Sequence, residues 1–367
     1  MTLTLPYESG HAILSFTASM TTVKTVNHPN QLGLPPEVER LKSWLPVDAT
    51  IRDERPMIEW MNMSGVVLSE PFFQQTVDRV RKTVEAESLF TDLDVLIQLE
   101  KISDRLDPTG FIFHSSRCGS TLVANACKAI GDSIVIAESS AVDKLITRFF
   151  TDLDDAGTKE LLYSVFLRGA IHALGQRRMK NERHYFVKFA STSTLQFARI
   201  RKIWPKVPAV FLYRDPIEVM VSNLKTIPEW MIIETNPATA AATVGVGESE
   251  VSQIGREEFC ARALGRYYSA AEANADQQTW LVNYDELTPD LLLRIISFFG
   301  VIPSSQEAQT ISQTARLYSK DAVGRTTFHG DREEKRTKAS AQVREMADRW
   351  ATPAYQRLES KRQIMTR

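Results

Sequence analysis

The sequence predicts an α/β fold in which helices flank a parallel sheet. From residue 107 to about residue 301, short apolar segments alternate with longer helical segments, and each apolar segment is rich in β-branched or aromatic residues. A parallel sheet with crossover helices has this pattern because its strands are buried on both faces. The expected strands are residues 111–114, 134–137, 185–189, 209–213 and 280–283. Their order in the sheet does not follow from the pattern.

Composition and charge exclude several classes of protein. The chain has 367 residues, of which 43% are hydrophobic and 24% charged, so a disordered or fibrous chain is excluded. Its 44 Lys and Arg residues nearly equal its 45 Asp and Glu residues, and the net charge of -1 offers no general attraction for nucleic acid or an anionic membrane. Any anion site must therefore be local.

The N-terminal sequence and the cysteines indicate the cellular compartment of the protein. The sequence does not open on a basic stretch followed by an apolar core, and no apolar run reaches membrane-spanning length. Cys118, Cys127 and Cys260 are odd in number and lack CxxC or His-paired spacing, which argues against a disulfide scaffold or a zinc site. We therefore expect a cytoplasmic protein that has neither nucleic acid nor a membrane as partner and holds no metal.

Turn signals and periodicity divide the chain into three regions. An Asp-Pro-Thr-Gly turn separates residues 1–106 from a core of residues 107–301, and residues 302–367 follow. The first region is expected to be mainly helical, serving either as a cap that shapes a substrate site or as a packing subdomain. Mixed charges along the last region predict an amphipathic helical extension. Residues 236–250, rich in Ala, Gly and Thr, predict a long loop that is either a substrate lid or a surface insertion.

A turn of small residues follows the first core strand and precedes a good helix. This order is the geometry of a phosphate cradle, because backbone N–H groups converge there and the helix dipole favours negative charge. Glycine in the turn allows close approach of the backbone to an anion, and hydroxyls add donors. The candidate anion-binding residues are Ser116, Arg117, Cys118, Gly119, Ser120 and Thr121.

The turn departs from the triphosphate motif G-x-x-x-x-G-K-[ST]. His114 stands in place of the first Gly, and Ser120 stands in place of the Lys that contacts the β- and γ-phosphates. The one cation inside the turn is Arg117, and no acidic residue for magnesium is evident. The pattern favours a shorter anion bound without a metal; the alternative is a Ser-rich turn with a surface Arg.

A second anion element follows strand 209–213. Arg214 stands at the carboxyl end of that strand, the edge at which open α/β sheets bind ligands. Asp215 and Pro216 supply an N-cap and a first-turn proline, and Ser222 lies about two turns into the helix that they begin. A guanidinium with a hydroxyl can bind a terminal phosphate. Taken alone, the pattern also fits a plain capped helix.

Three segments resemble one family. FHSSRCGSTL (113–122) and FLYRDPIEVMVSNL (211–224) are similar to the 5′-phosphosulfate loop and the 3′-phosphate element of sulfotransferases that use 3′-phosphoadenosine-5′-phosphosulfate, PAPS. LVNYDELTPDLLLRIISFFGV (281–301) is similar to the segment that follows in that family. The resemblance covers residues 110–301 and keeps the order of the segments and the spacing of Arg214 and Ser222.

The resemblance implies a P-loop sulfotransferase-like core with PAPS as cosubstrate. The reaction would move a sulfuryl group to a hydroxyl or amine of a small-molecule acceptor without a metal. Two alternatives stay open: a P-loop kinase, which requires magnesium, and a nucleotide-binding regulatory protein without catalysis. The identity of the acceptor and the oligomeric state do not follow from the sequence.

The chain also departs from the small-molecule sulfotransferases of the cytosol. Those enzymes usually have Lys in the loop, Trp after its Thr pair, and a catalytic His two residues after a strand Lys; here the positions are Arg117, Leu122 and Ala190. Their late Arg-Lys-Gly segment is absent, with Lys320 and Arg325 as possible substitutes. Arg in the loop is more similar to the tyrosylprotein branch and many bacterial members, so the acceptor is not carried over.

Two residues are candidates for catalysis. Glu138 ends strand 134–137, expected beside the loop strand, where its carboxylate can accept the proton of the acceptor; the alternative is a cap on the next helix. Lys188 lies in an apolar strand, where its charge requires a partner such as the transferring sulfate. The alternative for Lys188 is an edge strand with its ammonium in solvent. His114 is a second possible base, although its place in the loop favours a role in ordering the turn.

Overall fold

A computed structural model provides the structure of the chain. It describes residues 2–7, 10–17, 20–25, 40–53, 55–83, 87–99, 104–147, 149, 155–314 and 332–365. Lys320 and Arg325 therefore lie outside the described residues.

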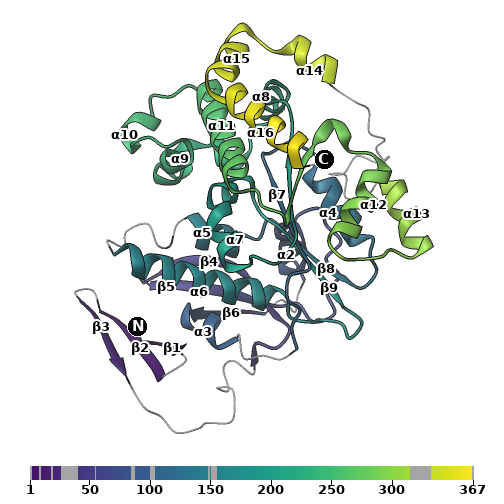
Figure 1. The fold of residues 1–367 in the computed structure, drawn as a ribbon. Helices are drawn as coiled ribbons and strands as arrows, with labels where there is room; N and C mark the ends of the chain where they lie inside the picture. The colour runs from purple at the N-terminus through teal and green to yellow at the C-terminus, as the bar shows by residue number, and fades with distance from the viewer. Residues whose placement is uncertain are drawn as a thin grey trace.

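A five-stranded parallel sheet forms the core and confirms the predicted α/β fold (Figure 1). The strands are β7 (Gly110–His114), β8 (Ser133–Ala137), β9 (His184–Lys188), β10 (Ala209–Tyr213) and β11 (Thr279–Asn283). All five predicted strands are confirmed to within a residue or two at each end. Their order is β11-β10-β7-β9-β8, so the expectation that β8 lies beside β7 is wrong. The hydrogen-bonded neighbour of β8 is β9, which separates it from β7.

Alternating side chains of the strands fill two cores. Phe111 and Phe113 of β7 pack into one core, whereas Ile112, between them, packs into the other. Successive residues of a strand point to opposite faces, and here both faces are covered, so every residue of β7 is buried. The apolar runs that predict the strands are a direct consequence of this double burial.

Helices cover both faces of the sheet (Figure 1). The core that contains Ile112 is closed by α4 (Ser120–Lys128), α12 (Pro289–Phe298) and α13 (Ser305–Thr314). The core that contains Phe111 includes α5 (Ser140–Thr147), α6 (Ala156–Leu174), α7 (Phe197–Ile203), α8 (Pro216–Lys225) and α11 (Arg256–Asn274). Because the five strands are parallel, the loops that leave their carboxyl ends all lie at one edge of the sheet.

The first region is not mainly helical, so that prediction is wrong. It contains two antiparallel sheets, one of β1 (Thr2–Tyr7), β2 (Gly10–Thr17) and β3 (Met20–Thr25), the other of β4 (Trp44–Arg52), β5 (Arg55–Asn62) and β6 (Ser88–Asp92). Its helices are short, α2 (Phe73–Arg81) and α3 (Asp94–Gln98). Helical periodicity holds only over α2, where Phe73, Val77 and Val80 are buried.

The hairpin of β4 and β5 packs against the core. The first residues of β4 are buried without a clear alternation, and β4 lies against α5 and α6. The ammonium of Lys144 on α5 lies 2.6 Å from a carboxylate oxygen of Asp48 on β4. The hairpin thus packs on the same core as the parallel sheet. Its strands form because of their packing against α5 and α6, which the local sequence pattern does not reveal.

Segment 236–250 is also not a loop. It forms α9 (Pro237–Val244) and α10 (Glu248–Val251). The Asn236 side chain caps α9, Pro237 occupies its first turn, and Gly245 ends it with a φ of 75°. Its alanines, which offer little core surface, are the best helix formers, so high intrinsic propensity outweighs the lack of a hydrophobic face.

The described parts of the last region are helical, as predicted. They contain α13, α14 (Arg332–Lys338), α15 (Ala341–Met346), a π-helical turn over Ala347–Ala351, and α16 (Thr352–Met365). Across the part of the chain that the structure describes, no helix has both the length and the apolar character required to cross a bilayer.

Candidate active site

One cavity lies at the carboxyl ends of the core strands. It has a volume of about 430 Å³. Residues at or just after the ends of β7, β8, β9, β10 and β11 contribute to its wall, with additions from α2, α8 and α14. The structure brings together nearly all of the predicted site residues here, namely Ser116, Arg117, Cys118, Gly119, Ser120, Thr121, Glu138, Arg214 and Ser222. Lys188 is absent from the lining but contacts Glu138 directly.

The loop after β7 is held in an unusual backbone conformation. Ser116, Arg117 and Gly119 have φ values of 74°, 49° and 82°, in the left-handed region that non-glycine residues rarely adopt. The amide of Ser116 donates a hydrogen bond to Nδ1 of His114 at 3.1 Å. Such strain persists only where the surroundings hold it, and it gathers at functional sites.

The side chain of Cys118 connects the loop to β10. Its buried thiol donates to the carbonyl oxygen of Leu212 on β10, with 3.1 Å between sulfur and oxygen. Burial raises the pKa of Cys118 to about 11, so the thiol stays protonated at neutral pH and is not a nucleophile. Burial likewise raises the pKa of Cys260, to about 12.

Helix α4 begins at this loop without a side-chain N-cap. Its N-cap is Gly119, which has no side chain to accept a hydrogen bond from the first turn. The first N–H groups of a helix have no intrahelical partner, and the helix dipole is positive at that end. Together with the hydroxyls of Ser120 and Thr121, this start of α4 is suited to an anion.

We expect Gly119→Ala to disrupt the loop. A Cβ atom at Gly119 would lie 2.4 Å from Cδ1 of Leu287, and the left-handed backbone alone costs about 1–2 kcal/mol for a residue with a Cβ. Chemical denaturation should show a loss of at least that size in the free energy of unfolding. The matched control is Gly131→Ala, where the nearest atom would be 3.8 Å away. Equal stability of the two variants would contradict the assigned role of Gly119.

Asn223 anchors the loop to α8 and was missed by the sequence analysis. Its fully buried Oδ1 accepts hydrogen bonds from Oγ of Ser116 and Nε of Arg117, each at 3.2 Å. The guanidinium of Arg117 also donates to the carbonyl oxygen of Thr226 at 2.8 Å. Arg117 is therefore both a cation on the cavity wall and a brace between the loop and α8. The only sequence feature that could have indicated this role is the position of Asn223 next to Ser222 on the predicted helix.

Glu138, which is partly exposed to the cavity, lies beside a buried lysine and a buried histidine. Oε1 of Glu138 forms an ion pair with Nζ of Lys188, and Nε2 of His114 lies 3.3 Å from the same oxygen. Because Nδ1 of His114 accepts the amide of Ser116, the geometry assigns its proton to Nε2, where it faces the carboxylate. Lys188 is on an interior strand and its side chain is fully buried, so the edge-strand interpretation is wrong.

Opposing effects determine the acidity of Glu138. Burial alone would raise its pKa, but the charge of Lys188 and the hydrogen bond from His114 outweigh burial and hold the pKa of this carboxyl well below its usual range. The carboxylate is therefore ionised at neutral pH. Glu138 also has a φ of 56°, which adds a second strained strand end to the site.

The capped helix of the second candidate anion element forms as predicted. Asp215 caps α8 by accepting the amides of Ile217 and Glu218 at 3.0 and 3.3 Å. Nε of Arg214 donates to the fully buried carboxylate of Glu218 at 2.6 Å, and the guanidinium lies 4.1 Å from the ring centre of Tyr284. These contacts hold Arg214 at the wall of the same cavity that the loop after β7 lines.

Helix α14 adds cations that sequence reasoning missed. Lys335 lines the cavity. Arg336 lies 2.8 Å from Asp215 and 3.1 Å from Glu218, the carboxylates that cap α8 and hold Arg214. The mixed charges of this helix gave no local signal, because its partners are more than a hundred residues away in the sequence.

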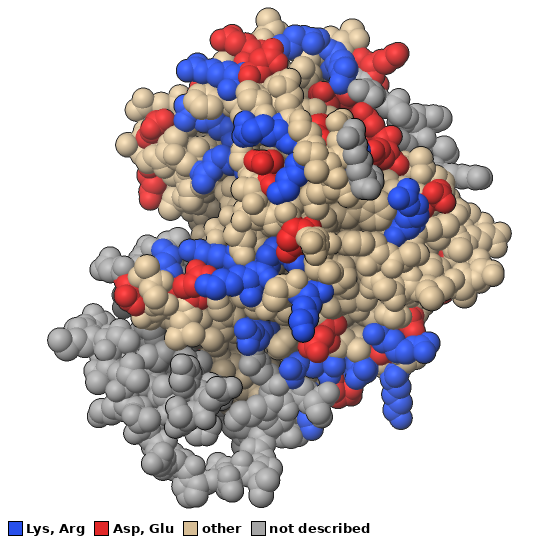
Figure 2. Space-filling view, in the orientation of Figure 1, with Lys and Arg blue, Asp and Glu red and all other residues tan. Residues whose placement is uncertain are grey.

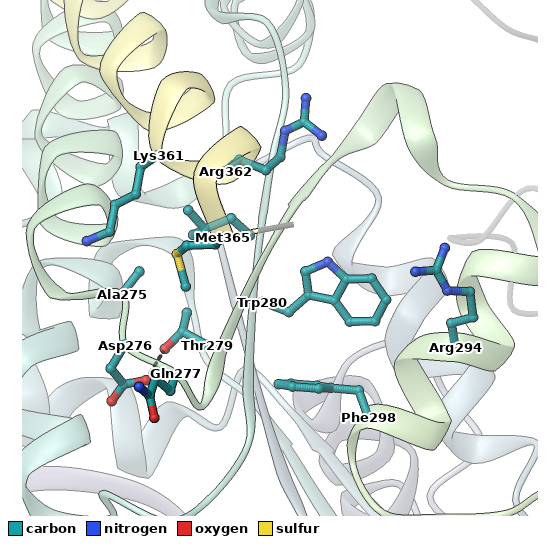
Figure 3. A pocket seen from close by; sticks show the side chains of 11 residues that line it. Ala275, Asp276, Gln277, Thr279, Trp280, Arg294, Phe298, Lys361, Arg362 and Met365 are labelled. Carbon is teal, nitrogen blue, oxygen red and sulfur yellow. Dashed lines mark hydrogen bonds between the residues drawn. The ribbon is translucent and has the colours of Figure 1, made fainter. Parts of the chain in front are cut away.

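Another cavity, with a volume of about 600 Å³, lies against the edge strand β11 (Figure 3). Several of its polar groups already have partners within the protein: Nζ of Lys361 donates to the carbonyl of Glu272, Arg362 pairs with Glu359 at 2.8 Å, and Asp276 accepts from Thr279. Among the residues that the structure describes, no group of three or more His, Cys, Asp or Glu is placed to hold a metal ion.

Comparisons with known proteins add a distant likeness. No protein family model and no curated protein matches the chain. Three solved structures show similarity: the sulfotransferase domain from the curacin biosynthetic pathway (15% identity, TM-score 0.36, covering 67% of this chain and 98% of that one), a sulfotransferase from Mycobacterium avium (10%, 0.35, 58% and 68%), and one from Alicyclobacillus acidocaldarius (14%, 0.36, 71% and 100%). These values carry no argument about function, which rests on the site itself.

Proposed function

We propose that this chain is a sulfotransferase that moves a sulfuryl group from PAPS to a hydroxyl or amine of a small-molecule acceptor. The observation that carries the proposal is the placement of two anion elements on one cavity wall, at the ends of the neighbouring strands β7 and β10. This arrangement fits a nucleotide with phosphates on both its 5′ and 3′ sides. Two of the three sequence segments that resemble the family contain these two elements.

The residues present fit the nucleotide. The uncapped start of α4, with Ser120 and Thr121, faces the position proposed for the 5′-phosphosulfate, and Arg117 supplies a charge there. Arg214 and Ser222 are assigned to the 3′-phosphate, with Lys335 on the same wall. Charge-assisted hydrogen bonds from guanidinium and ammonium groups suit both phosphates.

In the proposed reaction the acceptor oxygen or nitrogen forms a bond to sulfur while the bond from sulfur to the 5′-phosphate oxygen breaks. Glu138 takes the proton that the acceptor loses, and His114 keeps the carboxylate oriented. Lys188 is a buried positive charge beside this carboxylate, suited to balance charge that develops on the leaving oxygen. Movement of Lys188 toward that oxygen would make Glu138 a stronger base, because Lys188 lowers its pKa.

Nucleotide binding without metal tests the proposal. We expect calorimetry to show the same affinity for 3′-phosphoadenosine-5′-phosphate with and without a chelator, because protein cations and backbone amides neutralise the phosphates. Arg117→Ala should weaken this ligand and adenosine 5′-phosphate alike. Loss of binding in the chelator, or tighter binding of ATP with magnesium, would favour the kinase alternative. Transfer itself is measured with PAPS labelled in the sulfuryl group, incubated with pooled metabolites and followed by mass.

A further inference from the structure

Two more cavities continue from the nucleotide cavity. The second, of about 330 Å³, shares Glu138, Ser191, Pro228 and Trp230 with the first. Because it meets the first cavity at Glu138, it is the natural place for the acceptor under the proposed function. The third, of about 240 Å³, shares Thr147, Thr192 and Thr239 with the second. An elongated acceptor can thus reach from Glu138 into the third cavity.

The charges of the second and third cavities differ. The second has three carboxylates in its wall, Glu138, Asp143 and Glu229, and its Lys144 is paired with Asp48. Among the described residues, the wall of the third cavity contains no acidic residue and three basic ones. These are Lys159, Arg199 and Arg266, accompanied by the hydroxyls of Thr147, Thr192, Thr239, Thr243 and Tyr163. Figure 2 shows Lys and Arg side chains gathered over this part of the face, where Figure 1 places α6 and α9.

Arg266 contacts a backbone carbonyl and, within the described part of the chain, no carboxylate. It donates to the backbone carbonyl of Ala242 at 2.8 Å, and it forms no ion pair with a carboxylate among the described residues. Its guanidinium also packs closely against Gly245, because a Cβ added at that glycine would lie 2.4 Å from Nη1 of Arg266. Arg199, in contrast, has Glu160 at 2.9 Å. The third cavity therefore keeps a positive charge in a defined position.

Tyr163 supplies a second, independent observation. Its side chain is buried, with 3% of its surface exposed, and its hydroxyl has no hydrogen-bond partner among the described residues. Burial raises the pKa of Tyr163, so the hydroxyl is a donor at neutral pH. Buried polar groups are nearly always hydrogen-bonded, and one without a partner beside cations points to a ligand with acceptor oxygens.

We infer that the third cavity binds an anionic group, a carboxylate, phosphate or sulfate, at the end of the acceptor remote from the hydroxyl or amine that reacts. The role of this anion in the acceptor rests on the proposed function; the anion site itself does not. The acceptor is thus an elongated molecule with a reactive polar end, a middle that contacts Trp230, and an anionic end held by Arg266 and Tyr163.

Titration with inorganic phosphate tests the anion site on the full chain. By calorimetry we expect Arg266→Gln to lose one phosphate site or to weaken it about ten- to a hundredfold, as for a charge-assisted hydrogen bond. The matched control is Arg262→Gln, four residues earlier on α11, whose guanidinium pairs with Glu258 at 2.8 Å outside the three cavities. Tyr163→Phe, which keeps the ring, should weaken the same site severalfold. Unchanged phosphate binding in both cavity variants would overturn the inference.

Kinetics decide whether the anion belongs to the acceptor. Once acceptors are identified by mass, each is compared with an analogue that lacks its carboxylate, and we expect the acceptor with the carboxylate to have the higher kcat/KM. Arg266→Gln should reduce the ratio of the two kcat/KM values at least tenfold, whereas Arg262→Gln should leave it unchanged. An equal fall for both members of a pair would overturn the acceptor assignment and leave a site for a free anion. Absence of transfer by the unaltered protein would defeat the proposed function, whereas the phosphate titration would still decide the anion site.

Discussion

Glu138→Gln is expected to lower the rate of sulfuryl transfer by about 10²–10⁴-fold, the contribution of a positioned general base. The amide cannot take the proton of the acceptor, although it has nearly the shape of the carboxylate. Affinity for 3′-phosphoadenosine-5′-phosphate should change little, because Glu138 is assigned to the acceptor and not to the nucleotide. Single-turnover rates and calorimetry on the same preparation separate the two effects.

The same substitution tests the buried ion pair. Without the carboxylate, the fully buried ammonium of Lys188 loses its partner, and breaking a buried pair from one side costs about 3–5 kcal/mol. Glu138→Gln combined with Lys188→Met removes both charges and should recover most of that stability without recovering transfer. A single variant with full turnover would show that the base lies elsewhere, and His114 would be the next candidate.

Arg214→Ala is expected to discriminate between ligands. It should weaken 3′-phosphoadenosine-5′-phosphate about ten- to a hundredfold, the loss of a charge-assisted hydrogen bond, and adenosine 5′-phosphate little, since only the former has a 3′-phosphate. The buried carboxylate of Glu218 keeps Arg336 as a partner, which favours a folded variant. Affinities of both ligands by calorimetry, with circular dichroism as the check of folding, give the result.

Arg336→Gln is the matched control for this experiment. It removes a cation from the same carboxylate, Glu218, but Arg336 is not in the cavity wall. We therefore expect it to affect the two ligands equally and weakly. Equal loss of both ligands in Arg214→Ala would mean that Arg214 only supports the turn before α8, and the second phosphate assignment would fail.

Local signals account for what the sequence predicts correctly. Each core strand is buried on both faces, so its apolar run is visible without knowledge of its neighbours. The loop after β7 and the cap at Asp215 are likewise formed by consecutive residues, so the sequence predicts them directly. The nine predicted residues that line the cavity follow from these two local patterns and from the end of β8.

The rest depends on pairings between distant segments. The cluster of Glu138, Lys188 and His114 requires the order of β8, β9 and β7, which no local pattern contains. Asn223 and Arg336 act through partners on other elements. The hairpin of β4 and β5 was missed for the same reason, because the helices on which it packs come later in the chain.

The fixed loop after β7 also has a consequence for the thermodynamics of binding. Its left-handed residues are held by groups of the protein itself, namely His114, Asn223 and the carbonyl of Leu212. A mobile loop would lose conformational entropy when it closed around phosphates, and that loss would subtract from affinity. Here the loop after β7 becomes ordered when the chain folds, so the loss of its conformational entropy does not subtract from the affinity for a ligand. Under the proposed function the site is therefore preorganised, and an incoming phosphate would meet amide groups that already have their final directions.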